Sequence, residues 1–450
     1  MSTGKYKMSG PDRPSTQPNG VTGVTIDRWA AGGRGLGRVA GKVWMVAGAV
    51  PGDRVEALPI RDHGRHVDAV VRRLLDASQD RRVPPCPLQS RCGGCPMMPV
   101  AETAQREAKR RFVVDALERL GGFRDVPVAD LVPIDPALGY RTRIELTPAR
   151  VPGGGTRWGY HRVDDPQAIL DVPSCTIAHP ALQPLLDFVR SRPPDASGDA
   201  RLILRVSRSS AEKLLALRGE AGSVPPIASF ARAAMAADPD LVGVVRLVST
   251  PGRRGGSRTE VVAGRGWIEE EVLGTTFRVP GGTFLQVHAA AAEALGRRLL
   301  EEAGDPDDLV ELYAGVGAIG LAAARRGTRA TLVDADPDAI ACGDEAARRL
   351  GLDVALVRSD VLRFLAARAG NAPPALVVAD PPRTGFGRGV ASRLATWGPP
   401  RIAVVSCDPA TLARDAAALA AGGYVLERVA PYDFFPQTAH VEALAWLRRR

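Results

Sequence analysis

The second half of the chain alternates short apolar runs with alanine-rich stretches, and this alternation restricts the possible folds more than any other feature. The apolar runs have the length of single strands and include ALVVADPP, RIAVVSC and YVLERVAPYD. The stretches between them are rich in alanine and leucine, which favour helices. Because strands that alternate with helices form βαβ units, residues 283–450 are predicted to form a doubly wound parallel sheet.

Each predicted strand of this sheet ends in an acidic or reactive residue. In chain order these are Glu311 to Tyr313, Asp334, Asp360, Asp380 and Cys407. Ligands of open α/β sheets bind beyond the carboxyl ends of the strands. The sequence therefore predicts one cleft that is lined by carboxylates and a thiol.

A glycine motif follows the first of these strands. Gly315, Gly317 and Gly320 have the order Gly-x-Gly-x-x-Gly and precede a helix. Glycines let the backbone pass close to a ligand, and the helix amino terminus offers unpaired N–H groups. Asp334, about nineteen residues after the first glycine, is placed to bind the ribose of an adenosine-type cofactor. On these residues alone the motif fits NAD as well as S-adenosylmethionine.

Two further stretches favour methyl transfer over hydride transfer. Asp380 is followed by two prolines, a rigid turn that fixes its carboxylate at the end of the strand. Cys407 ends the run IAVVSC, where a dehydrogenase has no use for a thiol. A thiolate that adds to C6 of uracil makes C5 able to attack a methyl group. A base must then remove the C5 proton, and His440 and Glu442 are the candidates.

The beginning of the chain has a different pattern. Residues 19–77 contain short alternating strands separated by glycine turns, which predict a small OB-like β-barrel of a kind that binds oligonucleotides. Arg34, Arg38 and Lys42 lie in its glycine-rich stretch, where a phosphate backbone can approach. Residues 1–18 are rich in Gly, Pro, Ser and Thr and predict a disordered tail.

Four cysteines fall in residues 78–282, for which a mixed pattern predicts an α+β central domain. Cys86, Cys92 and Cys95 lie in the stretch CPLQSRCGGCPM, and Cys175 follows at a distance. A stretch so rich in glycine and proline makes a poor hydrophobic core, so we expect these thiols to bind a metal centre. Four thiolates suit zinc or a [4Fe–4S] cluster, and composition does not choose between them.

The overall composition sets the expected surroundings. The net charge of +9 at pH 7 suits a polyanion such as nucleic acid, although an arginine-rich genome gives the same composition. The chain has neither an apolar run that could span a bilayer nor a secretory signal. We therefore expect a cytoplasmic monomer without membrane contact or an obligate protein partner. In that reducing compartment cysteines serve as ligands or catalysts.

The chain resembles the S-adenosylmethionine-dependent RNA 5-methyluridine methyltransferases, in particular the branch with a TRAM domain and an iron–sulfur cluster. GGRGLGRVAGKVWMVAGAVPGDRVE resembles TRAM, and TFLQV, ELYAGVG, VVADPPRTG, SCDPATLARD and FPQTAHVE occur in family order. The last three together are highly specific, and the resemblance covers nearly the whole chain. It implies a TRAM barrel at 19–77, a central domain with a [4Fe–4S] cluster on the four cysteines, and a Rossmann-like class I methyltransferase domain at 283–450.

The resemblance also implies roles for individual residues. Cys407 is the nucleophile, Glu442 is the base because the family places it two residues after the histidine, and Asp380 contacts the target base and the methyl donor. Phe284 is expected to hold the target base. The residues implied for S-adenosylmethionine are Gln286, Tyr313, Gly315, Asp334, Asp360 and Asp380. The implied product is 5-methyluridine in 23S ribosomal RNA, with transfer RNA as the alternative target.

Some positions depart from the family pattern, and other functions remain to be weighed. His288, Ala318 and Asp408 are departures that bear on cofactor affinity and rate, since a carboxylate beside a thiol raises the thiol's pKa.

A nitrogen methyltransferase would have an aromatic residue in place of Arg383, and a cytosine-C5 methyltransferase would have its cysteine after a proline. A non-catalytic RNA-binding relative is the alternative of another class, and the intact Cys407 disfavours it.

Overall fold

The computed structural model describes residues 20–450 except 31, 221–225, 250–256 and 369. The chain divides into two compact units: unit 1 is Met1–Ala104 with His161–Ala168, and unit 2 is Gln105–Tyr160 with Ile169–Arg450. The tail predicted for residues 1–18 lies outside the described residues. Among the helices that the structure describes, none has the length and apolar character needed to span a bilayer.

Unit 1 contains a curled six-stranded sheet of the order β1-β5-β6-β4-β3-β2. Its core is formed by alternate strand residues such as Val24, Val46 and Val55. Asp27 donates its backbone N–H to Leu36 at 2.8 Å, which joins the end of β1 to β3 and closes part of the barrel. The strands are β1 (Thr22–Thr25), β2 (Arg28–Ala30), β3 (Arg34–Val39), β4 (Lys42–Ala47), β5 (Arg54–Asp62) and β6 (His66–Asp76).

The first sheet of unit 2 has seven strands in the order β13-β12-β11-β10-β7-β8-β9. Its apolar side chains pack with two helices in one buried cluster, and a separate hairpin of β14 and β15 follows in the chain. The elements are β7 (Arg143–Arg150), β8 (Thr156–His161), β9 (Ile169–Asp171), η1 (Pro180–Leu182), α2 (Gln183–Ser191), β10 (Arg201–Val206), β11 (Lys213–Glu220), α3 (Ala228–Ala237), β12 (Leu241–Ser249), β13 (Ser257–Gly264), β14 (Trp267–Val272) and β15 (Thr275–Pro280).

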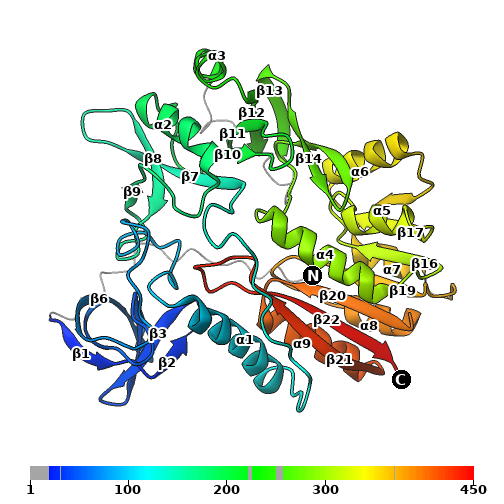
Figure 1. Ribbon diagram of the computed structural model, residues 1–450, viewed down its shortest axis with the longest axis horizontal. Helices are drawn as coiled ribbons and strands as arrows, with labels where there is room; N and C mark the ends of the chain where they lie inside the picture. The colour runs from blue at the N-terminus through cyan, green and yellow to red at the C-terminus, as the bar shows by residue number, and fades with distance from the viewer. Residues whose placement is uncertain (1–19, 31, 221–225, 250–256, 369) are drawn as a thin grey trace, which may run out of the picture. The chain divides into compact units, whose positions relative to one another are not determined.

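The second sheet of unit 2 follows the predicted doubly wound pattern, with the order β18-β17-β16-β19-β20-β22-β21 (Figure 1). The first five strands are parallel to one another. β22 differs from the prediction because it runs antiparallel to both of its neighbours, as the second arm of a hairpin must. The strands are β16 (Asp308–Leu312), β17 (Arg329–Asp334), β18 (Ala355–Arg358), β19 (Leu376–Ala379), β20 (Arg401–Ser406), β21 (Tyr424–Tyr432) and β22 (Glu442–Arg449).

Helices cover both faces of this sheet. Val377 and Ala379 of β19 pack in one cluster with α7, α8 and α9, whereas Leu376 and Val378 pack in another with α4 and α5. This alternation of buried side chains is the period of two that a strand buried on both faces requires. The helices are α4 (Ala289–Ala303), α5 (Ala318–Ala324), α6 (Pro337–Leu350), α7 (Val361–Ala366), α8 (Val390–Trp397) and α9 (Pro409–Ala421).

Helix α1 (Glu102–Arg119) holds the loop that connects β21 to β22. The fully buried Lys109 donates to Asp433 Oδ1 at 2.6 Å and to the carbonyl of Phe435 at 2.9 Å. Gln105 accepts the backbone N–H of Gln437 and donates to its side chain. Gln437 has a φ of 72°, a left-handed conformation that costs energy and persists only when its surroundings impose it. The contacts of α1 therefore fix the loop that leads into β22.

We predict that Lys109→Met lowers the free energy of unfolding by about 3–5 kcal/mol, because the buried Asp433 carboxylate loses its cation. Urea denaturation measures the change. Arg111→Gln is the control on the same helix: its ion pair with Asp115 is exposed, and its loss should cost less than about 1 kcal/mol. Equal, small effects of both substitutions would show that Lys109 does not support the loop.

Candidate active site

The glycine motif forms the turn between β16 and α5. A Cβ on Gly317 would lie 2.5 Å from Leu332 Cδ1, and one on Gly320 would lie 2.0 Å from Leu332 Cδ2. These two glycines are therefore needed for α5 to pack on β17. A Cβ on Gly315 would meet nothing within 4 Å, and the residue has a φ of 55°. The backbone of Gly315 is thus open to close approach by a ligand.

Two carboxylates hold this turn in place. Glu311 Oε2 accepts the N–H of Gly320 at 2.7 Å, and burial raises the pKa of Glu311 to about 8. Asp334 ends β17, and its Oδ2 accepts the N–H of Gly315 at 2.8 Å, while its Oδ1 accepts the N–H of Asp336 at 2.8 Å. Each carboxylate oxygen has a second lone pair, so Asp334 can still accept a ribose hydroxyl.

The other residues implied for the cofactor come from neighbouring turns. Tyr313 follows β16 with a φ of 57°, and its hydroxyl donates to the carbonyl of Phe386 at 2.9 Å. Burial, and then the charge of Asp360, raise the pKa of Tyr313, so Asp360 at the start of α7 lies near it. Gln286 is half-buried between β15 and α4; within the described part of the chain, no hydrogen bond links its side chain to this edge.

The predicted nucleophile and base lie at the ends of two paired strands. β20 and β22 are antiparallel neighbours, and Ser406 of β20 lies opposite Ala443 of β22. Continuing this register by one residue places Cys407 opposite Glu442. Directly opposed residues project to the same face, with Cβ atoms about 5 Å apart. The strand pairing therefore brings a thiol and a carboxylate together from positions far apart in the sequence.

The charges of several predicted site residues act on the Cys407 thiol. Burial, then the negative charges of Glu442 and Asp380, raise the pKa of the half-buried thiol to about 11, while the positive charge of Arg383 opposes the rise. The thiol is thus protonated at neutral pH in the protein alone. Any group that brings positive charge to this site lowers the cost of forming the thiolate.

Glu442 is a buried acid whose carboxylate oxygens accept no hydrogen bond from the described residues. Its exposed fraction is 1%. Burial and the nearby Asp380 raise its pKa well above the usual value, and Arg383 opposes this. Burial also raises the pKa of Asp380. Two carboxylates that share a site in this way are typical of functional sites, because stability alone does not favour them.

Arg383 and His440 complete this group. Arg383 Nη2 lies 3.5 Å from Nε2 of His440, whose ring contacts that of Phe435 edge to face. Desolvation by the surrounding protein, and then the charge of Arg383, lower the pKa of His440 to about 4. His440 is therefore a weak base here, and Glu442 is the stronger one. Arg383 was not assigned a role from the sequence, although its position directly after the two prolines placed it at the cleft.

Asp408, a departure from the family pattern, caps the helix that follows Cys407. Its Oδ1 accepts the N–H groups of Ala410 and Thr411, both at 2.9 Å, and so caps α9. Cys407 precedes this cap and therefore lies at the amino end of α9, where the helix dipole favours an anion.

His288, another departure, is buried at the start of α4. Its exposed fraction is 1%, and its ring stacks on Tyr140 with centroids 4.6 Å apart. Burial, and then Arg208, lower the pKa of His288 to about 4, so it is neutral. Tyr140 donates to the carbonyl of Pro436, which ties this ring pair to the β21–β22 loop.

Cys86, Cys92 and Cys95, which are close in the sequence, lie in a loop of unit 1 that is folded by its own backbone hydrogen bonds. Cys92 donates its N–H to Leu88 at 2.8 Å, and Cys92 Sγ accepts the N–H of Gly94 at 3.4 Å. Cys86, Cys92 and Cys95 are all half-buried. Such backbone donors to sulfur favour the thiolate form that a metal centre needs. Cys175, also half-buried, belongs to unit 2, and the grouping of all four stays a prediction.

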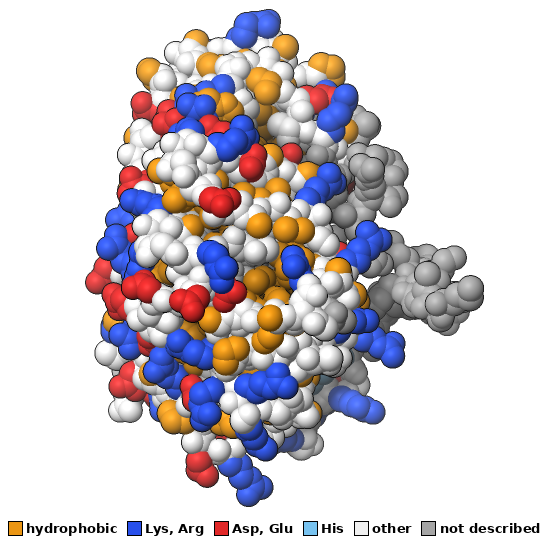
Figure 2. Space-filling model, turned by 90° about the vertical axis from the view of Figure 1, so that its right-hand side faces the viewer, with side chains coloured by type: hydrophobic (Ala, Val, Ile, Leu, Met, Phe, Trp, Pro, Cys, Tyr) orange, Lys and Arg blue, Asp and Glu red, His pale blue; other side chains and the backbone are white. Residues whose placement is uncertain are grey.

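The basic residues predicted to meet phosphate are partly neutralised. Arg34 pairs with Asp68 at 2.6 Å and Lys42 with Asp62 at 2.6 Å. Arg38 donates to a backbone carbonyl of its own turn. On the face that Figure 2 views, Lys and Arg side chains are interspersed with Asp and Glu rather than gathered in one patch.

Comparison with known proteins identifies the family. A family model described as tRNA (Uracil-5-)-methyltransferase matches residues 372–450, which include Cys407 and Glu442. An uncharacterized RNA methyltransferase of Gloeobacter violaceus is 34% identical over 448 residues, which are 95% of this chain and 96% of that protein. One of Synechocystis is 31% identical, with 97% of each chain covered.

A solved structure has the same fold. The tRNA (uracil-54, C5)-methyltransferase of Pyrococcus abyssi, in complex with S-adenosyl-L-homocysteine, superposes with a TM-score of 0.71. It is 22% identical, and the match covers 95% of this chain and 100% of that one. The Rossmann-like methyltransferase fold predicted from the sequence is thereby confirmed. The chain therefore belongs to a family of RNA methyltransferases that depend on S-adenosylmethionine and share the C-terminal segment of the tRNA (uracil-5-)-methyltransferases.

Proposed function

We propose that this protein methylates C5 of a uridine in RNA, with Cys407 as the nucleophile and Glu442 as the base. The observation that carries the proposal is the antiparallel register of β20 and β22, which sets the two residues opposite each other at the end of the sheet. Asp380 and Arg383 both act on the charge of this pair. One strong nucleophile beside one strong base is what covalent C5 methylation requires.

The carboxyl edge of the sheet fits S-adenosylmethionine, which supplies an electrophilic methyl group. The open backbone of Gly315 gives a ligand close access, and the spare lone pairs of Asp334 suit ribose hydroxyls. Along this edge, Asp380 lies between the turn that contains Gly315 and the thiol of Cys407, because β19 separates β16 from β20. The residues that would hold the cofactor are Gln286, Tyr313, Gly315, Asp334, Asp360 and Asp380.

The first step is the addition of Cys407 to the uracil ring. The thiol loses its proton to water, and Arg383 together with the amino end of α9 stabilises the resulting thiolate. The sulfur forms a bond to C6, and the electrons of the C5=C6 double bond move to the oxygen on C4. Carbon C5 is then nucleophilic enough to form a bond to the methyl group, which bound S-adenosylmethionine would supply with S-adenosylhomocysteine as the leaving group.

The last step is the removal of the C5 proton by Glu442. The carboxylate accepts this proton, the C5=C6 double bond forms again, and the S–C6 bond breaks to release Cys407 as a thiolate. The raised pKa of Glu442 makes its ionised form a stronger base than an exposed carboxylate. Asp380, whose pKa is also raised by burial, would hydrogen-bond the polar edge of the uracil ring.

The substrate must expose its uridine, because C5 and C6 cannot be reached inside a stacked duplex. Phe284 supports this requirement, since its ring is 61% exposed and can stack on an extruded base. We propose 23S ribosomal RNA in the cytoplasm as the target, on the resemblance of the N-terminal segment to TRAM. Transfer RNA is the second candidate, because the solved protein with the same fold is named for a uracil of tRNA.

We also propose that Cys86, Cys92, Cys95 and Cys175 bind a [4Fe–4S] cluster, with zinc as the second candidate. The N–H donor to Cys92 Sγ and the half-buried positions of all four thiols support a bound metal centre. The chemistry of the four thiolates fits either group. Methyl transfer needs no electron, so these cysteines serve structure or RNA positioning.

Cys407→Ala should lower methyl transfer by roughly 10⁴-fold or more, because no other group can activate C5. The measurement is transfer of labelled methyl to unmodified 23S rRNA and, separately, to unmodified tRNA. S-adenosylmethionine binding, followed by calorimetry, should be unchanged. Cys342→Ala, which removes a buried thiol elsewhere, is the control and should keep its activity. Turnover by the Cys407 variant near that of the control would remove Cys407 from this role.

Glu442→Gln should stall after methylation and slow product release by roughly 10²-fold or more, because the C5 proton stays in place. A covalent protein–RNA adduct should then accumulate and migrate slowly on a denaturing gel. Glu427→Gln, an exposed carboxylate on β21, is the matched control and should form no such adduct. Normal release of product by the Glu442 variant would place the base elsewhere.

Anaerobically purified protein should contain about four iron and four sulfide per chain if the cluster proposal holds. Cys95→Ser should abolish this content, whereas Cys342→Ser should not change it. Zinc in place of iron would support the second candidate. Wild-type protein with neither metal would overturn both.

A further inference from the structure

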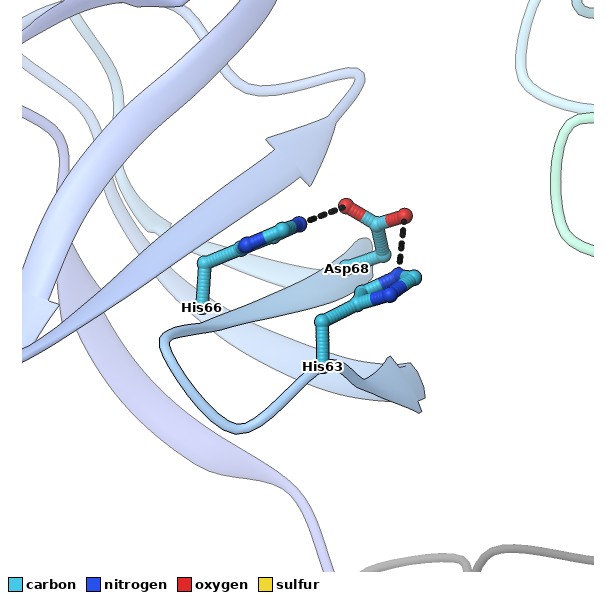
Figure 3. Close-up of side chains that lie close together, drawn as sticks. All are labelled: His63, His66 and Asp68. Carbon is cyan, nitrogen blue, oxygen red and sulfur yellow. Dashed lines mark hydrogen bonds and ion pairs between the residues drawn. The ribbon is translucent and has the colours of Figure 1, made fainter. Parts of the chain in front are cut away.

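Two imidazoles and a carboxylate meet on the β5–β6 hairpin of unit 1 (Figure 3). His66 and Asp68 are alternate residues of β6, so their side chains project from the same face. His63 lies in the connection between the strands, and its N–H donates to the carbonyl of His66 at 2.9 Å. Figure 3 shows both rings directed toward the carboxylate. The backbone of the hairpin therefore brings the three groups together.

The separations of these groups are close to those that a tetrahedral ion requires. His63 Nε2 lies 3.2 Å from Asp68 Oδ2, and His66 Nε2 lies 3.9 Å from Asp68 Oδ1. One ligand atom from each residue can be chosen so that all lie within 4.8 Å of one another. A zinc ion with bonds near 2.0–2.1 Å sets its ligand atoms about 3.3 Å apart. The rings of His63 and His66 stack with centroids 4.5 Å apart, so the two side chains must rotate to direct their nitrogens at one ion.

Arg34 supports the orientation of the carboxylate. Its Nη1 donates to Asp68 Oδ1 at 2.6 Å, which leaves Oδ2, the oxygen nearer His63, to bind an ion. Metal-binding carboxylates are commonly held in this way by a second hydrogen bond, which fixes their direction. Among the described residues, this is the single group of three or more His, Cys, Asp or Glu side chains whose ligand atoms lie close enough to share one metal ion.

We propose that His63, His66 and Asp68 form a binding site for a divalent transition metal ion, with zinc as the physiological candidate. Imidazole nitrogens favour zinc, cobalt, nickel and copper over magnesium and calcium. The side chains are 32%, 33% and 26% exposed, so a water molecule has room to complete the tetrahedron. A bound ion would link the turn between β5 and β6, which contains His63, to strand β6 and so make this end of the barrel more rigid. The site is independent of the proposed methyl transfer.

The test is a cobalt(II) titration of the full-length protein, followed by visible absorption. Nitrogen and oxygen ligands give weak d–d bands alone, whereas the cysteines would add intense thiolate charge-transfer bands, so the two kinds of site are distinguished. Wild-type protein should bind one equivalent with the bands of nitrogen and oxygen ligands. His66→Gln and Asp68→Asn should each weaken this binding at least tenfold.

Two controls separate loss of a ligand from loss of an ion pair. Asp76→Asn removes a carboxylate of the same strand that pairs with Arg54, and it should leave cobalt binding unchanged. Arg34→Gln removes the partner of Asp68 and should retain the site with weaker binding. Zinc should also raise the melting temperature of the wild type and of Asp76→Asn more than that of His66→Gln. Equal cobalt affinity in the wild type and His66→Gln, or no such bands in the wild type, would overturn the proposal.

Discussion

The reversed direction of β22 is the constraint on which the candidate site depends. In a wholly parallel sheet, the amino end of a strand lies at the edge opposite to the ligand cleft. Because β22 runs antiparallel to β20, its first residue, Glu442, lies at the carboxyl edge beside Cys407. The same reversal puts the β21–β22 loop at this edge. A single change of strand direction thus brings both the Glu442 carboxyl group and the neighbouring loop to this edge.

Burial of several acids near this edge opposes stability, and the surrounding structure compensates for it. Glu311, Asp380 and Glu442 all have raised pKa values, chiefly because of burial. The cost of burying Glu311 is partly offset by the hydrogen bond that it accepts from the N–H of Gly320. Neither oxygen of Glu442 has a hydrogen-bond partner among the described residues. The buried contacts of Lys109 with the β21–β22 loop hold the chain in place just before this buried carboxyl group.

Much of this arrangement could be predicted from the sequence, because strand length and the residues at strand ends are local properties. Asp334 ends its strand, and Asp380 and Cys407 directly follow theirs, as predicted. The direction of β22 could not be predicted in this way, because an apolar run looks the same whether its strand is parallel or antiparallel to its neighbours. The ion pair of Lys109 and Asp433 could not be predicted either, because the two residues lie 324 positions apart in the sequence.

The sequence also leaves the partners of a polar residue open, and the structure supplies them. Asp408 was expected to raise the pKa of the thiol beside it, and the structure adds that its carboxylate accepts the N–H groups that begin α9. Arg34 and Lys42 were expected to face phosphate, but each has an acidic partner in the barrel. Local composition predicts which residues are polar, whereas the fold decides which groups they meet.

The position of β22 between β20 and β21 has a consequence for biosynthesis. As the chain emerges from the ribosome, both flanking strands are made before the strand that separates them. Until β22 inserts, the open edge of β20 has unpaired backbone groups, and the thiol has no carboxylate opposite it. The Cys407 thiol and the Glu442 carboxylate, on neighbouring strands of the finished sheet, are therefore brought opposite each other only when β22 inserts between two strands that are already made.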